Sequence, residues 1–159
     1  MTIDHAHPGG EAVGQLKHRS PWEVALIVGL RHWCDGPLGQ ATIQSDFALA
    51  LSESAAQRVY ASFDQLLRLI LQHAHRPLVR HDIDCPCCGA DEAVFAQLVR
   101  TATSGDLHDA ALVATLLAGP AKAELIAILA GEVGSAMQRM TENHALLGTL
   151  PAQQRAGLH

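Results

Sequence analysis

Apolar residues recur at helical spacing through residues 55–74, and this pattern constrains the fold more than any other feature of the chain. The stripe consists of Ala55, Val59, Phe63, Leu66, Leu67, Ile70 and Ala74. Steps of three and four positions place these side chains on one face of an α-helix. A helix with so long an apolar face gains most of its stability by packing that face against other elements. The pattern therefore predicts a helix inside a bundle.

The rest of the chain repeats this kind of pattern between clear helix breaks. Only 4% of the 159 residues are aromatic, so Ala, Leu, Val and Ile must fill the core, and Ala and Leu are strong helix formers. Breaks that contain Gly, Pro or Ser separate the segments. The expected helices cover roughly residues 20–35, 39–51, 54–76, 91–103, 107–118 and 120–142. We predict an all-α, single-domain bundle of about six helices over residues 20–150, between flexible tails at 1–19 and 151–159.

The first of these helices has distinct ends and no polar face. Ser20, Pro21 and Glu23 form a capping-box start, and Gly36 followed by Pro37 ends the segment. A helix that is apolar nearly all round belongs at the centre of a bundle. The sixth helix is expected to bury Leu125, Ile128, Met137 and Met140 among others. The predicted core is Trp22, Leu26, Phe47, Phe63, Leu67, Ile70, Phe95, Val113 and Leu129.

Charge and hydropathy predict which kinds of partner the protein does not bind. The formal net charge is −5, and no run of Lys or Arg occurs, so we expect no nucleic-acid partner. The first twenty residues do not resemble a signal peptide, and the longest apolar run near the start, Val24 to Leu30, is too short to cross a bilayer. We expect no membrane partner and a cytoplasmic location, where cysteines stay reduced.

One segment, at about residues 76–90, has no helical periodicity and is long for a connection between two helices. It contains the stretch HDIDCPCCG, with Cys85, Cys87 and Cys88 within four positions and His81 four residues before the first. Read as C-P-x-C-G with Cys85 and Cys88 as the pair, five residues resemble the knuckle of zinc ribbons. Cys85 and Cys87, in a C-x-C pair bent by Pro86, are the second interpretation. The sequence leaves both open.

Clustered thiols in a reducing compartment favour a metal site over disulfides or inert buried thiols. The expected ligands are His81, Cys85, Cys87 and Cys88, and the expected cofactor is zinc or a similar transition metal. Structural zinc takes four ligands: the knuckle gives two, His81 is the expected third, and the fourth is Cys87 or one of His75, His73, Cys34 and His32. Arg76 and Arg80 would lie around it and offset the negative charge of the thiolates.

A thiolate-rich shell is typical of a closed, structural ion, which would also hold the long loop in one conformation. We therefore expect a non-enzymatic interaction or regulatory protein with an unknown protein partner, and we assign no catalytic residue. One alternative is a thiol redox sensor that uses Cys87 and Cys88. Another is a metal-dependent hydrolase with an open zinc site and Asp84 or Glu92 as the base.

Small residues on the sixth helix suggest a homodimer. Ala127, Gly131 and Gly134 lie among apolar residues and would permit close approach of a second helix. That second helix can belong to another copy of the chain or to the same bundle. The sequence does not distinguish the two arrangements.

Overall fold

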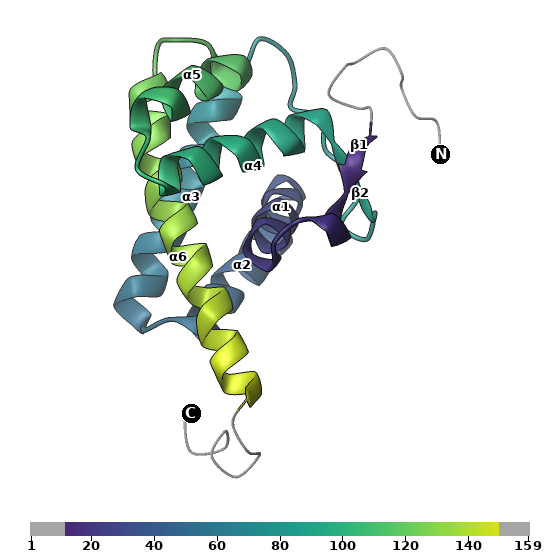
Figure 1. The fold of residues 1–159 in the computed structure, drawn as a ribbon, viewed down its shortest axis with the longest axis vertical. Coiled ribbons are helices and arrows are strands. Elements are labelled where there is room, and N and C mark those ends of the chain that lie inside the picture. Colours follow the sequence, from purple (N-terminus) through teal and green to yellow (C-terminus); the bar gives the residue numbers. More distant parts are fainter. Residues whose placement is uncertain (1–11, 150–159) are drawn as a thin grey trace.

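A computed structural model describes residues 12–149 of the chain, and the side chains of residues 12–144. Within that part the chain forms six α-helices and one small antiparallel sheet of two strands (Figure 1). The helices are α1 Pro21–Cys34, α2 Pro37–Ala50, α3 Glu53–His73, α4 Ala90–Thr103, α5 Leu107–Ala118 and α6 Ala123–Thr149. The strands are β1 Ala12–Gln15 and β2 Cys87–Gly89. The predicted all-α, single-domain bundle is confirmed.

Local sequence signals explain where the first three helices begin. At the start of α1, the Glu23 carboxylate accepts hydrogen bonds from the Ser20 N–H at 3.3 Å and from its hydroxyl at 2.8 Å. Between α1 and α2, Gly36 has a φ of +94°, a conformation that favours glycine. Ser52 caps α3 by accepting a hydrogen bond from the Ala55 N–H. The capping box and the break at Gly36 were both predicted.

The start of α4 differs from its prediction. Asp91 was expected to cap this helix, but the helix begins at Ala90 and its N-cap is Gly89. The Glu92 side chain accepts the Gly89 N–H at 3.0 Å, in the way that the acidic residue of a capping box does. Asp91 lies in the first turn, where its carboxylate binds Arg76 and a backbone N–H instead.

The core lies where α6 packs against α1, α3, α4 and α5. The apolar stripe of α3 forms one wall of this core, as its spacing predicts. Of the nine predicted core residues, Trp22 and Val113 are only partly buried at the edge. The others are buried: Leu26, Phe47, Phe63, Leu67, Ile70, Phe95 and Leu129.

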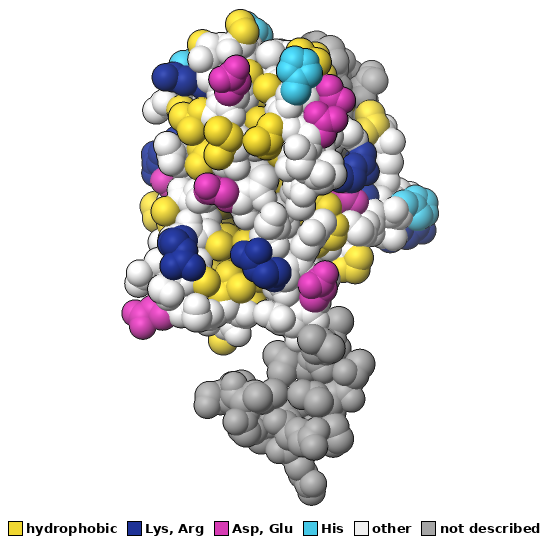
Figure 2. Space-filling model, turned by 60° about the vertical axis from the view of Figure 1, so that its left-hand side comes forward, with side chains coloured by type: hydrophobic (Ala, Val, Ile, Leu, Met, Phe, Trp, Pro, Cys, Tyr) yellow, Lys and Arg dark blue, Asp and Glu magenta, His cyan; other side chains and the backbone are white. Residues whose placement is uncertain are grey.

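The predicted inner face of α6 is partly wrong. Leu125 and Ile128 were expected in the core but are 37% and 48% exposed, while Ile126 and Ala130 are fully buried. Because α6 meets α1, α3, α4 and α5 together, its buried face includes small residues that hydropathy alone ranks below Leu and Ile. Figure 2 shows hydrophobic side chains reaching the surface between charged ones on the side of the bundle that α5 and α6 help to form.

The small residues of α6 pack within the chain. Gly131 lies against the backbone of Ala102 in α4, and a Cβ added at Gly134 would lie 1.8 Å from the Thr103 hydroxyl oxygen. Close contact between α6 and α4 therefore accounts for these glycines. This is the intramolecular arrangement, so the glycines no longer support the predicted homodimer, which stays a prediction.

The segment before α1 pairs with the cysteine-containing loop. Residues 12–18 were expected within a flexible tail but form β1 and a short 3₁₀ turn, and β1 pairs antiparallel with β2. The Leu16 N–H donates to the Pro86 carbonyl at 2.9 Å. The remainder of that tail, and the expected tail at 151–159, lie outside the described residues.

No single helix in residues 12–149 is both long enough and apolar enough to cross a membrane. Helices α5 and α6 together have the length and hydropathy of a membrane span, but the chain bends by 109° between them. This bend lies at the break after Gly119, whose φ of +67° ends α5.

Candidate functional site

A buried arginine fixes the backbone of the cysteine loop, which we define as residues 74–89 between α3 and α4. The Arg31 side chain, on α1, is fully buried. Its Nη1 donates to the carbonyls of Asp82 at 3.1 Å and Cys85 at 2.8 Å, and Nη2 donates to that of Cys87 at 2.6 Å. Nε and Nη2 also donate to the two Glu92 carboxylate oxygens at 2.7 and 2.9 Å. Five hydrogen bonds match the five N–H donors of a guanidinium.

Glu92, on α4, is the counterpart of this arginine. Besides its bidentate pair with Arg31, its carboxylate accepts the His81 N–H and the Gly89 N–H, both at 3.0 Å. Burial by itself would raise the pKa of Glu92, but the hydrogen bonds from Arg31 and these two amides outweigh it and lower the pKa. We call Arg31, Glu92 and the backbone groups they bind the polar hub. It joins α1, α4 and both halves of the cysteine loop.

A second ion pair holds the first part of the loop. Arg76 donates from both terminal nitrogens to the Asp91 carboxylate at 2.8 Å, and the Val79 N–H donates to the same carboxylate at 2.8 Å. Arg80 pairs with Asp35 at 3.1 Å near the end of α1. The two arginines expected around a metal therefore bind carboxylates, and they tie the loop to α4 and α1.

The loop brings two of the four expected metal ligands together. The Cys85 Sγ lies 3.8 Å from the His81 Nδ1. The neighbouring Cys85 thiol raises the pKa of Cys87. Cys88, the next residue of strand β2, is fully buried beside Ile27, as expected because consecutive strand side chains point to opposite faces. This arrangement favours the C-x-C interpretation over the Cys85–Cys88 knuckle.

The other proposed ligands contact different parts of the molecule. His32 lines a pocket between α1, α2 and α6, and the His75 ring lies beside Gly119. Cys34 is partly buried, and burial raises its pKa. Within the described part of the chain, no group of three or more His, Cys, Asp or Glu side chains is arranged to hold a metal ion. One feature near the thiols lacks a partner: the His81 Nε2 is buried without a hydrogen bond.

The alternatives to a non-enzymatic metal site have less support from the geometry. Glu92 is fully buried and its carboxylate already accepts four hydrogen bonds, so it cannot serve as the base of a hydrolase. Asp84 is exposed on the loop. Cys87 and Cys88, the pair expected in a redox sensor, lie on opposite faces of β2. Burial raises the pKa of Cys88, contrary to what a reactive thiol needs.

Sequence reasoning missed the polar hub, although two signals were present. Arg31 is the only basic residue in α1 other than His32, inside an otherwise apolar segment, and such a charge requires a buried partner. Glu92 follows the loop glycine at the capping-box distance. Pairing these residues across 61 positions requires the tertiary structure. Comparison of the chain with protein-family models, with curated proteins and with solved structures finds no match.

Proposed function

We propose that this protein is a small, non-enzymatic regulatory or interaction protein whose cysteine loop takes up a thiophilic metal ion, with zinc as the first candidate. The proposed ligands are Cys85, Cys87 and His81. We place it in the cytoplasm, where these thiols stay reduced. Cys88, a ligand in the sequence-based set, is excluded from the proposed site because it is buried on the other face of β2.

One observation carries the proposal: the Cys85 thiol and the His81 imidazole lie close together, with the Cys87 thiol two residues further on, in a loop whose backbone other groups fix. Arg31 binds the carbonyls of both Cys85 and Cys87, so the positions from which the two thiols project are set before any ion arrives. Both thiols and the imidazole are only partly buried, which leaves room for side-chain rotation. Sulfur and imidazole donors suit zinc and other soft or borderline ions.

The role that we propose for the ion differs from the structural role expected from the sequence, which stays a prediction. A structural zinc was expected to hold the long loop in one conformation. The polar hub and the Arg76–Asp91 pair bind the loop through protein groups. An ion that is not needed for folding can exchange with the surroundings, and this property suits regulation. The fourth ligand would come from water or from a partner protein.

Thiol redox chemistry is the second candidate, because Cys85 and Cys87 are close. A redox sensor needs at least one thiol with a lowered pKa, since the thiolate is the reactive form. The pKa of Cys87 is raised by the Cys85 thiol beside it. A cation removes that obstacle by stabilising both thiolates together, so the same geometry favours metal uptake over redox sensing.

Metal titration of the reduced, metal-free protein tests the proposal. Cobalt(II) is the probe because its thiolate charge-transfer absorption counts the sulfur ligands, and zinc is then added to displace it. We expect about one equivalent of cobalt per chain. Cys85→Ser and Cys87→Ser should each lose the thiolate absorption. Cys88→Ala and Cys34→Ala are the matched controls and should keep it.

These cysteine variants distinguish the C-x-C site from the Cys85–Cys88 knuckle and from the redox candidate. Loss of binding in Cys88→Ala with retention in Cys87→Ser would favour the knuckle pair and contradict the C-x-C site. Binding that survives in a Cys85→Ser/Cys87→Ser double variant would contradict the proposal altogether. If the reduced protein takes up no metal but forms a Cys85–Cys87 disulfide under mild peroxide, the redox candidate replaces it.

A further inference from the structure

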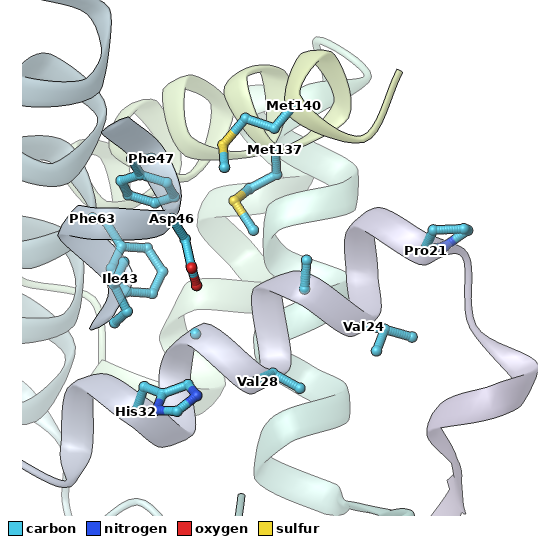
Figure 3. Close-up of a pocket in the computed structure, with 12 residues that line it drawn as sticks. Pro21, Val24, Val28, His32, Ile43, Asp46, Phe47, Phe63, Met137 and Met140 are labelled. Atoms are coloured by element: carbon cyan, nitrogen blue, oxygen red, sulfur yellow. The ribbon is translucent and has the colours of Figure 1, made fainter. Parts of the chain in front are cut away.

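A pocket of about 330 Å³ lies between α1, α2 and α6, away from the cysteine loop (Figure 3). Its volume is at the lower end of the range for small-molecule sites. The residues that line it come from segments far apart in the sequence, including Val24 and Val28 of α1, Phe47 of α2 and Met137 of α6. The pocket is therefore a product of the tertiary packing.

The walls of the pocket are mainly apolar. Phe47 and Phe63 form an edge-to-face pair with ring centroids 6.1 Å apart, and Met137 and Met140 approach from α6. Methionine side chains are flexible and polarisable, and they adapt to ligands of different shape. Aromatic rings and thioethers together form a surface that accepts apolar groups, including those that carry a positive charge.

Gly29 helps to keep the pocket open. It lies in the middle of α1 and lines the pocket, and a Cβ added there would meet the Phe63 ring at 3.4 Å. Glycine inside a helix is unfavourable relative to alanine because it has more conformational freedom to lose. Any larger side chain at this position would occupy the space between α1 and the Phe63 ring.

Few polar side chains line the pocket. Among the described residues, Asp46 of α2 and His32 of α1 are its polar side chains, and no Lys or Arg lines it. Figure 3 shows the Asp46 side chain extending from α2 toward α1. Asp46 is exposed at the rim of the pocket and, among the described residues, has no side-chain hydrogen bond or ion pair. This carboxylate would attract a ligand that carries a positive group.

We propose that the pocket between α1, α2 and α6 binds a small apolar molecule that carries a protonated amine. The apolar part lies against Phe47, Phe63 and Met137, and the ammonium group pairs with Asp46. A carboxylate or phosphate ligand is disfavoured, because Asp46 would repel it and no Lys or Arg of the described part of the chain lines the pocket. This inference does not depend on the metal proposal, because the two sites share no residue.

Binding of three molecules of equal length tests the ligand class: n-hexylammonium, n-hexanol and n-hexanoate. Chemical-shift titration of the full chain reports both affinity and location. We expect n-hexylammonium to bind most tightly and n-hexanoate least. In Asp46→Asn the preference for the ammonium over the alcohol should fall about threefold, within the range of an exposed ion pair. Asp109→Asn, an exposed carboxylate on α5, should leave the preference unchanged.

Variants that fill the pocket test the location. Gly29→Leu should abolish binding of all three molecules, with circular dichroism confirming the helical content. If Gly29→Leu does not fold, Val28→Phe fills the same space from α1. Equal affinities for the ammonium and the carboxylate, or binding that survives in the filled variant, would overturn the proposal.

Discussion

The apolar core and the polar hub hold the same bundle together in different ways. The core is a broad set of side chains from all six helices, in which Phe63, Leu67 and Phe95 each contact several apolar neighbours. The hub consists of one arginine, one glutamate and a few backbone groups. In the core, truncation of one side chain removes part of the buried apolar surface. In the hub, loss of one partner leaves the other partner charged and buried.

This difference has a consequence for specificity. Apolar packing tolerates substitution of similar volume, because it lacks direction. The hub has direction, since the Arg31 donors match three loop carbonyls and a carboxylate in one geometry. The core therefore stabilises the bundle, and the hub determines the conformation of the cysteine loop. Breaking each region separately distinguishes these roles.

The largest effect is expected from Glu92→Ala. The change leaves Arg31 fully buried without its anion, and two backbone amides lose their acceptor. Breaking a buried ion pair in this way costs about 3–5 kcal/mol. Urea denaturation, followed by circular dichroism, measures the change in the free energy of unfolding.

A double variant controls for the loss of charge. Arg31→Met/Glu92→Leu removes both charges together, so most of the stability lost in Glu92→Ala should return. The cysteine loop should nevertheless lose its fixed conformation in the double variant, because its carbonyls no longer have donors. A double variant as unstable as the single one would indicate that the hub contributes through packing alone.

Leu67→Ala is the corresponding change in the core. Leu67 is 1% exposed on the stripe of α3, and truncation of a buried leucine costs about 2–5 kcal/mol. Here the loop should stay as ordered as in the wild type up to the unfolding transition. Leu71→Ala is the matched control on the outer side of α3, where the side chain is 40% exposed. A loss below about 0.5 kcal/mol in Leu67→Ala would place this residue outside the core.

These two regions also differ in how far the sequence predicts them. Hydrophobic periodicity and helix-end signals predict the six helices, because they depend on neighbours within a few positions. They predict the α3 stripe but misplace Leu125 and Ile128, since α6 packs against four helices and buries small residues. Clustering of cysteines identifies the loop. The choice between Cys87 and Cys88 depends on which face of β2 is buried, and β2 exists because β1 pairs with it.

Acid should weaken the hub before it weakens the core. The pKa of Glu92 is held below its ordinary value of 4.5 by Arg31 and two amides, and the pKa of Asp91 is lowered from 3.8 by Arg76 and the Val79 N–H. A lowered pKa contributes stability that is present above the ordinary value and is lost as pH falls through the folded-state value. We therefore expect the free energy of unfolding to fall below pH 4.5.

The pH profile of Glu92→Gln tests the source of that loss. The glutamine at position 92 takes up no proton as the pH falls, so the stability of this variant should fall less steeply in acid than that of the wild type. Urea titrations across the acid range measure both slopes. Parallel slopes would assign the acid sensitivity to other carboxylates.

The smallest effect is expected from Arg76→Ala. Arg76 is 39% exposed, and its partner Asp91 keeps the hydrogen bond from the Val79 N–H. A loss of about 1 kcal/mol fits an ion pair of this exposure. Arg68→Ala, which breaks a more exposed pair with Asp64 on α3, is the control and should cost less. If Arg76→Ala lowers the free energy of unfolding as much as Glu92→Ala does, the expected order of the two effects is wrong.

Amide hydrogen exchange in the metal-free protein tests most directly whether the polar hub, and not an ion, holds the cysteine loop. The reporters are the His81 and Gly89 amides, both bonded to Glu92, with the exposed loop residue Asp84 as an internal reference. After chelation we predict that both reporters stay protected in the wild type and lose protection in Arg31→Met/Glu92→Leu. If chelation alone makes them exchange as fast as Asp84, and zinc restores their protection, the loop depends on metal and the hub does not fix it.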